Sequence, residues 1–351
     1  MNAKNNNLLK AKKEANDEFY TQYEDIAKEI EHYKEHLKGK VIYCNCDIPY
    51  LSNFHKYFLD NFKDLELKSL IVTGYSKDGN GKCSVHDGEK STDYDLLGDG
   101  DFRGDECIDM LQKADVVITN PPFSLFRDFI KVVVDTRKDF IVVGSKNAIT
   151  YKDVFPLLMK DEMFIGATNA SNFITNHEYL STKNTFIKDG VKCAKFGNIG
   201  WFTSFNVHKN DYLELTKEYN ESEYPKYDNY DAINVNKVKD IPKDYDGVMG
   251  VPITFLDKYN PNQFEILGET QRGCHYEFPD IKKYDDYWEV RQSGEKTGSR
   301  GGKTNENANL EMNDGKKNYF INAEGHIVQS AYQRIFIRHK TKEINDTLQN
   351  K

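Results

Sequence analysis

The sequence predicts an α/β fold in which helices cover both faces of a mostly parallel sheet, followed by a C-terminal region of different character. Between residues 41 and 143, short apolar runs of strand length alternate with segments whose apolar residues recur at helical spacing. Such alternation is typical of βαβ units. Beyond about residue 205 the composition shifts to Tyr, Asn, Asp and Lys, with prolines between short segments. We therefore expect a first domain over 1–205 and a second, α+β or irregular region over 206–351.

Local patterns place the elements of the first domain. Residues 24–37 carry apolar residues at helical spacing and end at Lys38-Gly39-Lys40, which is a turn sequence. Apolar runs predict strands at 41–44, 69–73, 115–119 and 140–143. Helices are predicted between these strands at 53–62, 106–113 and 124–135. The stretch 74–105 is rich in Gly, Asp and Ser and predicts a long loop, with a hairpin around Gly79-Asn80-Gly81.

The composition bounds the class of protein. The chain has 351 residues, of which 38% are hydrophobic and 30% charged, and no apolar run approaches the roughly 18 residues of a membrane span. The N-terminal residues 1–13 lack the apolar core of a signal peptide. The six cysteines show neither a CxxC pair nor a metal-binding spacing, so reduced thiols are expected. We expect a cytoplasmic protein that has no membrane partner.

The charge distribution is more informative than the total. A net charge of −8 argues mildly against nucleic acid, because phosphate binding needs a basic surface. Residues 291–303, RQSGEKTGSRGGK, nevertheless combine basic residues with Gly and Ser, which is suited to a loop that follows a phosphate backbone. Solvated charge on tails and helix faces is the alternative explanation. We name 291–303 the basic loop; its cationic residues are Arg291, Lys296, Arg300 and Lys303.

The tetrapeptide Asn120-Pro121-Pro122-Phe123 follows a predicted strand and precedes a predicted helix. An exocyclic amine on an aromatic base is a poor nucleophile, because its lone pair is delocalised into the ring. The Asn120 side-chain carbonyl and the Pro121 backbone carbonyl can each accept one N–H of such an amine, which favours a more tetrahedral nitrogen. The prolines restrict the backbone of this segment, and Phe123 offers a ring for stacking. The pattern indicates an amino-group methyltransferase, although Asn-Pro and Pro-Pro are also common in turns that end strands.

Several motifs together resemble the EcoRI-type adenine-specific DNA methyltransferases. Ahead of the first predicted strand stands Asp17-Glu18-Phe19-Tyr20-Thr21-Gln22-Tyr23. That strand ends in Tyr43-Cys44-Asn45-Cys46-Asp47-Ile48-Pro49-Tyr50, which is followed by Ser52-Asn53-Phe54. Asn120 to Phe123 matches the family's catalytic motif, and Gly197-Asn198-Ile199-Gly200-Trp201-Phe202 resembles its later aromatic motif. These motifs occur in the family's order and span most of the chain. As a set they are far more specific than any one of them.

This resemblance implies a Rossmann-like fold that binds S-adenosylmethionine and forms N6-methyladenine in double-stranded DNA by base flipping. It assigns catalysis to Asn120, Pro121, Pro122 and Phe123. The residues that it assigns to the methyl donor are Phe19, Tyr20, Thr21, Tyr43, Asn45, Asp47, Pro49, Asp101, Phe102 and Asn120. Contacts with the target base or the DNA are expected from Trp201, Phe202, Arg291, Lys296, Arg300 and Lys303. No metal is required, because the protein's main contribution to an in-line methyl transfer is alignment.

Two features depart from the wider methyltransferase pattern. Asn45-Cys46-Asp47-Ile48-Pro49 stands where a Gly-rich loop usually follows the first strand. The second strand ends at Thr73-Gly74-Tyr75 without an acidic residue for the ribose hydroxyls of the donor. Individual donor contacts are therefore less well defined by the sequence than the activity is.

Other functions remain open at this point. RNA adenine and protein glutamine amides can be methylated by the same Asn-Pro-Pro-aromatic chemistry, although glutamine methyltransferases place their extra domain before the core. A DNA-binding module without turnover is a further alternative, against which the intact motif at 120–123 argues. The sequence does not identify the target site, and it leaves open a cognate restriction endonuclease in a restriction-modification system or an orphan epigenetic role. The resemblance favours a monomer.

Overall fold

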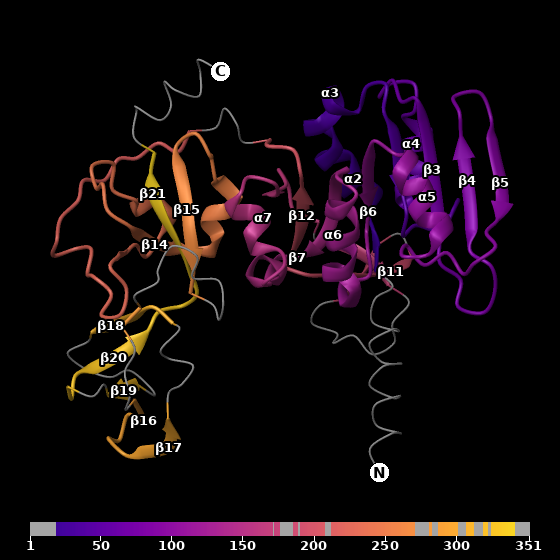
Figure 1. Ribbon diagram of the computed structural model, residues 1–351. Helices are drawn as coiled ribbons and strands as arrows, with labels where there is room; N and C mark the ends of the chain where they lie inside the picture. The colour runs from indigo at the N-terminus through magenta and orange to yellow at the C-terminus, as the bar shows by residue number, and fades with distance from the viewer. Residues whose placement is uncertain are drawn as a thin grey trace, which may run out of the picture. The chain divides into compact units, whose positions relative to one another are not determined.

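The computed structural model describes residues 19–170, 172–175, 185–188, 190–207, 212–270, 281–282, 287–300, 307–311, 319–321 and 324–340. The chain forms two compact units, which are coloured along the sequence in Figure 1. The first comprises Met1–Val154 and Glu162–Val207, and the second comprises Phe155–Asp161 and His208–Lys351. No helix among the described residues is both long and apolar enough to cross a membrane.

An eight-stranded sheet forms the centre of the first unit, in the order β5-β4-β3-β2-β6-β7-β12-β8. The strands are β2 (Val41–Cys44), β3 (Ser69–Gly74), β4 (Lys82–His86), β5 (Ser91–Asp95), β6 (Val116–Thr119), β7 (Asp139–Ser145), β8 (Phe164–Ile165) and β12 (Ile199–Thr203). The four central strands, β3, β2, β6 and β7, pair in parallel. The hairpin β4–β5 extends one side, while β12 pairs antiparallel with both β7 and β8 on the other (Figure 1). The predicted α/β architecture is confirmed.

The strand order places a topological switch point between β2 and β6. From β2 the chain continues to β3 on one side, and β6 later pairs with the other side of β2. Ligands in open α/β sheets bind at such a point, outside the carboxyl ends of the strands. Residues 45–47 follow β2 there, and residues 120–123 follow β6.

Helices cover both faces of this sheet because its strands are apolar on both sides. On one face, α2 (Tyr23–Ile30) and α4 (Asn53–Asp60) pack against residues that alternate along the strands, such as Ile42, Val72 and Ile118. The other face carries α5 (Asp105–Lys113) and α6 (Phe126–Asp135), with ring contacts from Phe126 to Phe202 and from Phe129 to Phe102. Burial of this apolar surface on both faces is the main stabilisation of the unit.

Two local predictions need correction. The helix predicted at 24–37 is divided into α2, a 3₁₀ turn η1 (Glu31–Tyr33) and α3 (Lys34–Leu37), because the backbone at Tyr33 leaves the helical region (φ −117°, ψ 2°). The hairpin turn lies at 87–90 and not around 79–81. The Asp87 side chain accepts the backbone N–H groups of Glu89 and Lys90, and Gly88 has a φ of +98°. Gly81 instead approaches the backbone of Gly100 so closely that a Cβ atom would lie 2.6 Å from its Cα.

A smaller antiparallel sheet with the order β1-β9-β11-β10 completes the first unit. Its strands are β1 (Phe19–Thr21), β9 (Asn172–Thr175), β10 (Thr185–Lys188) and β11 (Val191–Lys195). The connection from β8 to β9 is held against α2 by the buried Glu29 carboxylate, which accepts the backbone N–H groups of Ala167 and Thr168. This unit also contains the 3₁₀ turns η2 (Phe123–Leu125) and η3 (Lys146–Thr150).

The second unit contains two further, mainly antiparallel sheets. One has the order β13-β14-β21-β15, with β13 (Ile233–Asn234), β14 (Met249–Pro252), β15 (Phe264–Glu269) and β21 (Arg334–His339). The other has the order β17-β16-β19-β20-β18, with β16 (Trp288–Val290), β17 (Lys296–Arg300), β18 (Asn309–Glu311), β19 (Tyr319–Ile321) and β20 (Ile327–Ser330). Helix α7 (Phe155–Met159) and the 3₁₀ turns η5 (Val238–Asp240) and η6 (Ile253–Lys258) complete its described elements.

Candidate active site

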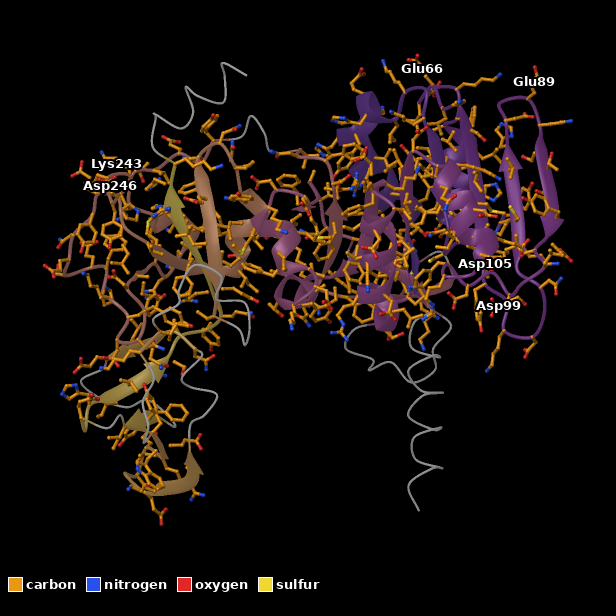
Figure 2. All side chains as sticks on the ribbon, in the orientation of Figure 1. Glu66, Glu89, Asp99, Asp105, Lys243 and Asp246 are labelled. Carbon is orange, nitrogen blue, oxygen red and sulfur yellow. The ribbon has the colours of Figure 1, made fainter. Side chains whose placement is uncertain are left out.

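The candidate site lies at the carboxyl end of the parallel strands in the first unit. Figure 2 shows Glu66 and Glu89 at the amino end of the sheet and Asp99 and Asp105 at the opposite, carboxyl end. The loop that carries Asp99 is tied to the end of β3, because the Ser76 N–H donates to the Asp99 carbonyl at 2.8 Å. Acidic side chains near this edge give it a potential suited to a cationic ligand.

Asp47 joins the loops that follow β2 and β6. The hydroxyls of Ser52 and Thr119 donate to its two carboxylate oxygens, each at 2.5 Å, and the Asn120 backbone N–H is a further donor. The Asp47 N–H itself donates to the Thr73 carbonyl at 3.0 Å, which adds the end of β3. The Asp47 side chain thus joins the loop after β2 to the end of β6 and fixes the start of the 120–123 loop, while its backbone N–H adds the end of β3.

The Asp47 carboxyl group is buried, with 6% of the residue exposed. Burial raises the pKa of this group to about 6, because a charged carboxylate is poorly solvated in the interior. The hydrogen bonds from Ser52, Thr119 and Asn120 act in the opposite direction and limit the rise of the pKa. Its oxygens therefore serve the loop network, and contact with a donor nucleoside stays a prediction.

Asn45 and Thr21 carry buried polar atoms of a different kind. Both residues are at most 2% exposed. Among the residues that the structure describes, no partner accepts from the Asn45 amide nitrogen or donates to its side-chain oxygen, and none bonds the Thr21 hydroxyl. Buried polar groups are nearly always hydrogen-bonded, so such atoms indicate a place where a ligand completes the site. Thr21 is linked to the same edge, because the Asn53 amide at the start of α4 donates to its carbonyl at 2.8 Å.

The loop 120–123 leads from β6 into the 3₁₀ turn that begins at Phe123. Pro121 is buried, while Asn120, Pro122 and Phe123 are half-buried. Pro122 has φ −56° and ψ 125°, and its carbonyl accepts the Leu125 N–H at 3.0 Å as the 3₁₀ turn begins at Phe123. The two prolines stiffen the segment that presents the Asn120 and Pro121 carbonyl groups. The predicted role of these two carbonyl groups in accepting an amine stays a prediction.

The other residues predicted to contact the donor differ in their burial and in their hydrogen-bond partners. Phe19 and Tyr20 lie in β1, but their side chains are outside the described part of the chain. The Tyr43 ring is fully buried, and its hydroxyl bonds the Thr73 hydroxyl at 2.9 Å. Pro49 is half-buried in the loop after β2. A direct contact of Tyr43 with a donor is therefore harder to make than one from Asn45.

Asp101 and Phe102 have other partners in this structure. The Arg103 guanidinium pairs with the Asp101 carboxylate at 2.6 Å and lowers its pKa. The Phe102 ring is 4% exposed and packs edge-on against Phe129, at a centroid distance of 5.3 Å. Their predicted roles as acceptor and cover for the donor adenine stay predictions.

The aromatic residues of β12 are core residues in this structure. Trp201 is fully buried and contacts Phe54 on one face of the sheet, while Phe202 contacts Phe126 on the other. Neither ring is accessible to a base in this arrangement. The predicted contact of Trp201 and Phe202 with a flipped base has no geometric support here and stays a prediction.

The basic loop lies in the second unit and is only partly described. The Arg291 guanidinium is 3.7 Å from the Glu295 carboxylate, and the Lys296 ammonium lies 4.2 Å from the centre of the Trp288 ring. Lys296 and Arg300 belong to β17, which pairs with β16, so the prediction of a loop is wrong for 296–300. The Arg300 side chain and all of Lys303 lie outside the described residues.

Sequence reasoning missed the residues that position the site. Ser52, Thr119 and Asn53 hold Asp47 and Thr21 in place. Ser52 and Asn53 stand in a motif shared with the family, but no role was predicted for any of the three. Ser52 could have been found as a helix N-cap, since its hydroxyl also accepts the Phe54 N–H. Thr119 gives no such signal, because a hydroxyl at a strand end is common whether or not it contacts a neighbouring loop.

The residues at this edge fit a donor that has a polar amino-acid end. The unpartnered atoms of Asn45 supply both a donor and an acceptor, and the Thr21 hydroxyl supplies a third group. Over the described ranges, no three His, Cys, Asp or Glu side chains are grouped so that they could hold a metal ion.

The sequence is similar to known proteins over most of its length. The sequence matches the family model described as adenine-specific methyltransferase EcoRI, over residues 7–96 and 77–340. It is 47% identical to the Type II methyltransferase M.EcoRI of Escherichia coli over 296 residues, which cover 76% of this chain and 90% of that protein. It is 41% identical to the Type II methyltransferase M.MpnI of Mycoplasma pneumoniae over 269 residues, covering 74% of this chain and 84% of the relative. No solved structure matches the chain.

Proposed function

Because the chain belongs to the EcoRI family of adenine-specific methyltransferases, we propose that it transfers a methyl group from S-adenosylmethionine to N6 of an adenine in duplex DNA. The chain is a site-specific DNA methyltransferase, as its similarity to Type II methyltransferases over most of its length indicates. The observation that carries the proposal is the position of Asn120-Pro121-Pro122-Phe123 at the switch point, beside the unpartnered side chain of Asn45.

The loop 120–123 supplies the catalytic groups. With the adenine out of the helix, the Asn120 side-chain carbonyl and the Pro121 backbone carbonyl accept the two N–H groups of its amine. These bonds hold the nitrogen lone pair toward the methyl carbon. The amine attacks in line with the carbon–sulfur bond, whose electrons leave with sulfur, and the amine then loses one proton to solvent. Alignment of three atoms is the main contribution of the protein to this step.

Thr21 and Asn45 hold the donor, whose sulfonium makes the methyl group electrophilic. Their buried atoms provide two hydrogen-bond donors and two acceptors for the polar groups of the donor. Asp47 does not touch the reacting atoms in this proposal. It keeps Asn120 in register with Asn45 through the bonds from Ser52, Thr119 and the Asn120 N–H.

Asn120→Ala tests the catalytic assignment. We expect methylation of unmethylated genomic DNA to fall about a hundred- to a thousandfold, since a preorganised acceptor at the reacting group is lost. Donor affinity and the unfolding free energy should change little. The assay uses labelled S-adenosylmethionine, nucleoside mass spectrometry and modification-sensitive sequencing. Unchanged turnover in the variant would remove Asn120 from the mechanism, and label that enters RNA or protein instead of DNA would replace the substrate.

We further propose that residues 1–205 form the catalytic domain and that 206–351 recognise the target DNA through the basic loop. Joint substitution of Arg291, Lys296, Arg300 and Lys303 by Gln should weaken DNA binding and lower the slope of log affinity against log salt by up to about 3 to 4. Fluorescence titration of duplex DNA from 50 to 200 mM salt measures this slope. The matched control is Lys217, Lys237, Lys239 and Lys258 to Gln in the same unit. An unaltered slope in the first variant would place the basic loop off the interface.

The partners follow from the same proposal. The enzyme acts as a monomer that is paired with a cognate restriction endonuclease or works alone as an epigenetic regulator. Light scattering on the free protein and on its DNA complex tests the monomer. Digestion of the methylated DNA by restriction enzymes of matching specificity then tests whether the modification protects its site.

A further inference from the structure

A cavity of about 330 Å³ opens next to the catalytic loop and is lined by Phe123, Ser124, Arg127 and Tyr151. The residues come from the carboxyl ends of two adjacent parallel strands. Phe123, Ser124 and Arg127 follow β6, and Tyr151 follows β7 after the turn η3. The volume is at the lower end of the range of small-molecule sites.

The cavity brings a second aromatic residue close to the catalytic loop. Phe123 is the last residue of this loop and lines the cavity, so the cavity adjoins the carbonyl groups that would accept the amine. Trp201, the aromatic residue singled out by its motif, is fully buried and packs on Phe54. Tyr151 is half-buried and lines the same cavity as Phe123.

Arg127 gives the cavity a positive charge. Its side chain is 62% exposed, its guanidinium lies 5.9 Å from the centre of the Tyr151 ring, and it forms an ion pair with Asp153 at 3.7 Å. A flipped nucleotide brings its own phosphate to the rim of the pocket that takes the base. Guanidinium is well suited to phosphate because it presents several N–H donors in one plane.

We propose that Tyr151 is the second aromatic wall of the pocket for the flipped adenine, opposite Phe123, and that Arg127 binds the phosphate of that nucleotide. The inference rests on the proposed function and extends it to residues outside the family motifs quoted above. In the bound state, Arg127 exchanges its contact with Asp153 for the phosphate, while Tyr151 stacks on the base. Stacking on an aromatic side chain tolerates any base, so selection of adenine stays with the carbonyl groups at 120–121.

The test compares Tyr151→Ala with Tyr151→Phe on duplex genomic DNA. We expect Tyr151→Ala to lower kcat/KM for DNA about 10- to 100-fold, the range seen when a stacking residue is removed. Tyr151→Phe keeps the ring and should stay within threefold of the unchanged protein. Affinity for S-adenosylhomocysteine, measured by calorimetry, should not change in either variant. The matched control is Tyr94→Ala, which removes a 44% exposed tyrosine from the edge strand β5.

Two outcomes would overturn the assignment of Tyr151. Full activity in Tyr151→Ala would remove Tyr151 from the pocket, and equal losses in the Ala and Phe variants would mean that the hydroxyl and not the ring is used. If Tyr151→Ala unfolds at a lower temperature, Tyr151→Leu keeps the bulk without the ring and should show the same loss of kcat/KM.

Arg127→Gln should lower the slope of log DNA affinity against log salt by about 1, and an unchanged slope would contradict the phosphate contact. Absence of N6-methyladenine with the unchanged protein would instead refute the proposed function.

Discussion

Two buried polar side chains, Asn45 in the first unit and Arg334 in the second, differ in their hydrogen-bond partners. At the carboxyl edge of the first unit, Asn45 is 1% exposed and its amide has no partner among the described residues. In the second unit, Arg334 is 7% exposed, but its Nε donates to the Asn234 side chain at 3.2 Å and its Nη1 donates to the Tyr332 carbonyl at 3.1 Å. The Tyr227 hydroxyl donates to the same Asn234 oxygen at 2.7 Å.

This difference separates a binding site from a structural network. A buried polar group without a partner costs free energy, and the cost is recovered only when a ligand supplies the missing bonds. A network whose members bond each other stabilises the fold without a ligand. Asn45 and Arg334 are both polar and both buried. Their hydrogen-bond partners therefore decide which of them is expected to bind a ligand and which to stabilise the fold.

The largest expected effect follows from loss of the Arg334 network. Arg334→Met removes several charge-assisted bonds from the interior and leaves the Asn234 oxygen with fewer donors. We expect the second unit to lose about 3 to 4 kcal/mol of unfolding free energy. The readout is urea unfolding followed by tryptophan fluorescence in a Trp201→Phe background, where Trp288 in the second unit is the remaining tryptophan.

Arg338→Met is the matched control. Arg338 lies on the same strand and pairs with Glu265 at 3.0 Å, but the two side chains are 46% and 40% exposed. Exposed ion pairs contribute little, so a loss of about 1 kcal/mol or less is expected. Equal losses in the two variants would mean that burial of the Arg334 network adds nothing, and the comparison between the units would fail.

Asp47 is intermediate between Asn45 and the Arg334 network, because its carboxylate is hydrogen-bonded but its burial costs free energy. Its pKa is about 6 in the folded protein and 3.8 in the reference state, so the folded protein binds a proton that the unfolded chain has lost between these values. The contribution of Asp47 to stability therefore falls as pH rises from about 4 to 6, by about 3 kcal/mol.

Asp47→Asn removes this pH dependence. Relative to the unchanged protein, the variant should gain stability steadily as pH rises from about 4 to 6 and then keep a constant difference. Urea unfolding at four pH values, with Trp201 as the reporter in a Trp288→Phe background, measures it. Ser52→Ala removes a bond that lowers the pKa of Asp47, and it should extend the sloping range to higher pH. A difference between Asp47→Asn and the unchanged protein that is constant with pH would show that Asp47 stays charged in the fold.

The parallel sheet could be predicted because its strands are buried on both faces. Residues 41–44 and 140–143 form apolar runs bounded by polar residues, and burial on two sides leaves few alternatives for such runs. The hairpin turn could not be placed, because Gly81 looks like a turn residue and is used instead to approach Gly100. In the second unit, β14 pairs with β21 across more than eighty residues of mixed composition, and local patterns do not encode such pairings.

The site was predicted less evenly. Asn120 could be proposed from the sequence, because its chemistry requires a recognisable neighbourhood of prolines and an aromatic residue. The role of Asp47 as a brace could not be seen, because its partners Ser52 and Thr119 come from separate segments that only the fold brings together. Tyr151 carries no motif at all, and only the pairing of β6 with β7 brings it beside Phe123.

The smallest expected effect is the most specific test of the comparison. Asn45→Ala removes two unpartnered polar atoms, so the unfolding free energy should stay constant or rise by up to about 1 kcal/mol. Affinity for S-adenosylhomocysteine should fall about 10-fold, which corresponds to about 1.4 kcal/mol of lost hydrogen bonding. Calorimetry and urea unfolding on the same preparation give the two quantities.

Asn61→Ala is the matched control, since the Asn61 amide is already bonded to the Tyr57 carbonyl and the Tyr23 hydroxyl at the end of α4. It should lose about 1 kcal/mol of stability and keep its donor affinity. The two variants should therefore change in opposite ways. Asn61→Ala should lose stability and keep its donor affinity, whereas Asn45→Ala should lose donor affinity and keep its stability. If Asn45→Ala lost stability and bound the donor normally, the Asn45 side chain would serve the fold and not the donor. The distinction between Asn45 and the Arg334 network would then have no functional meaning.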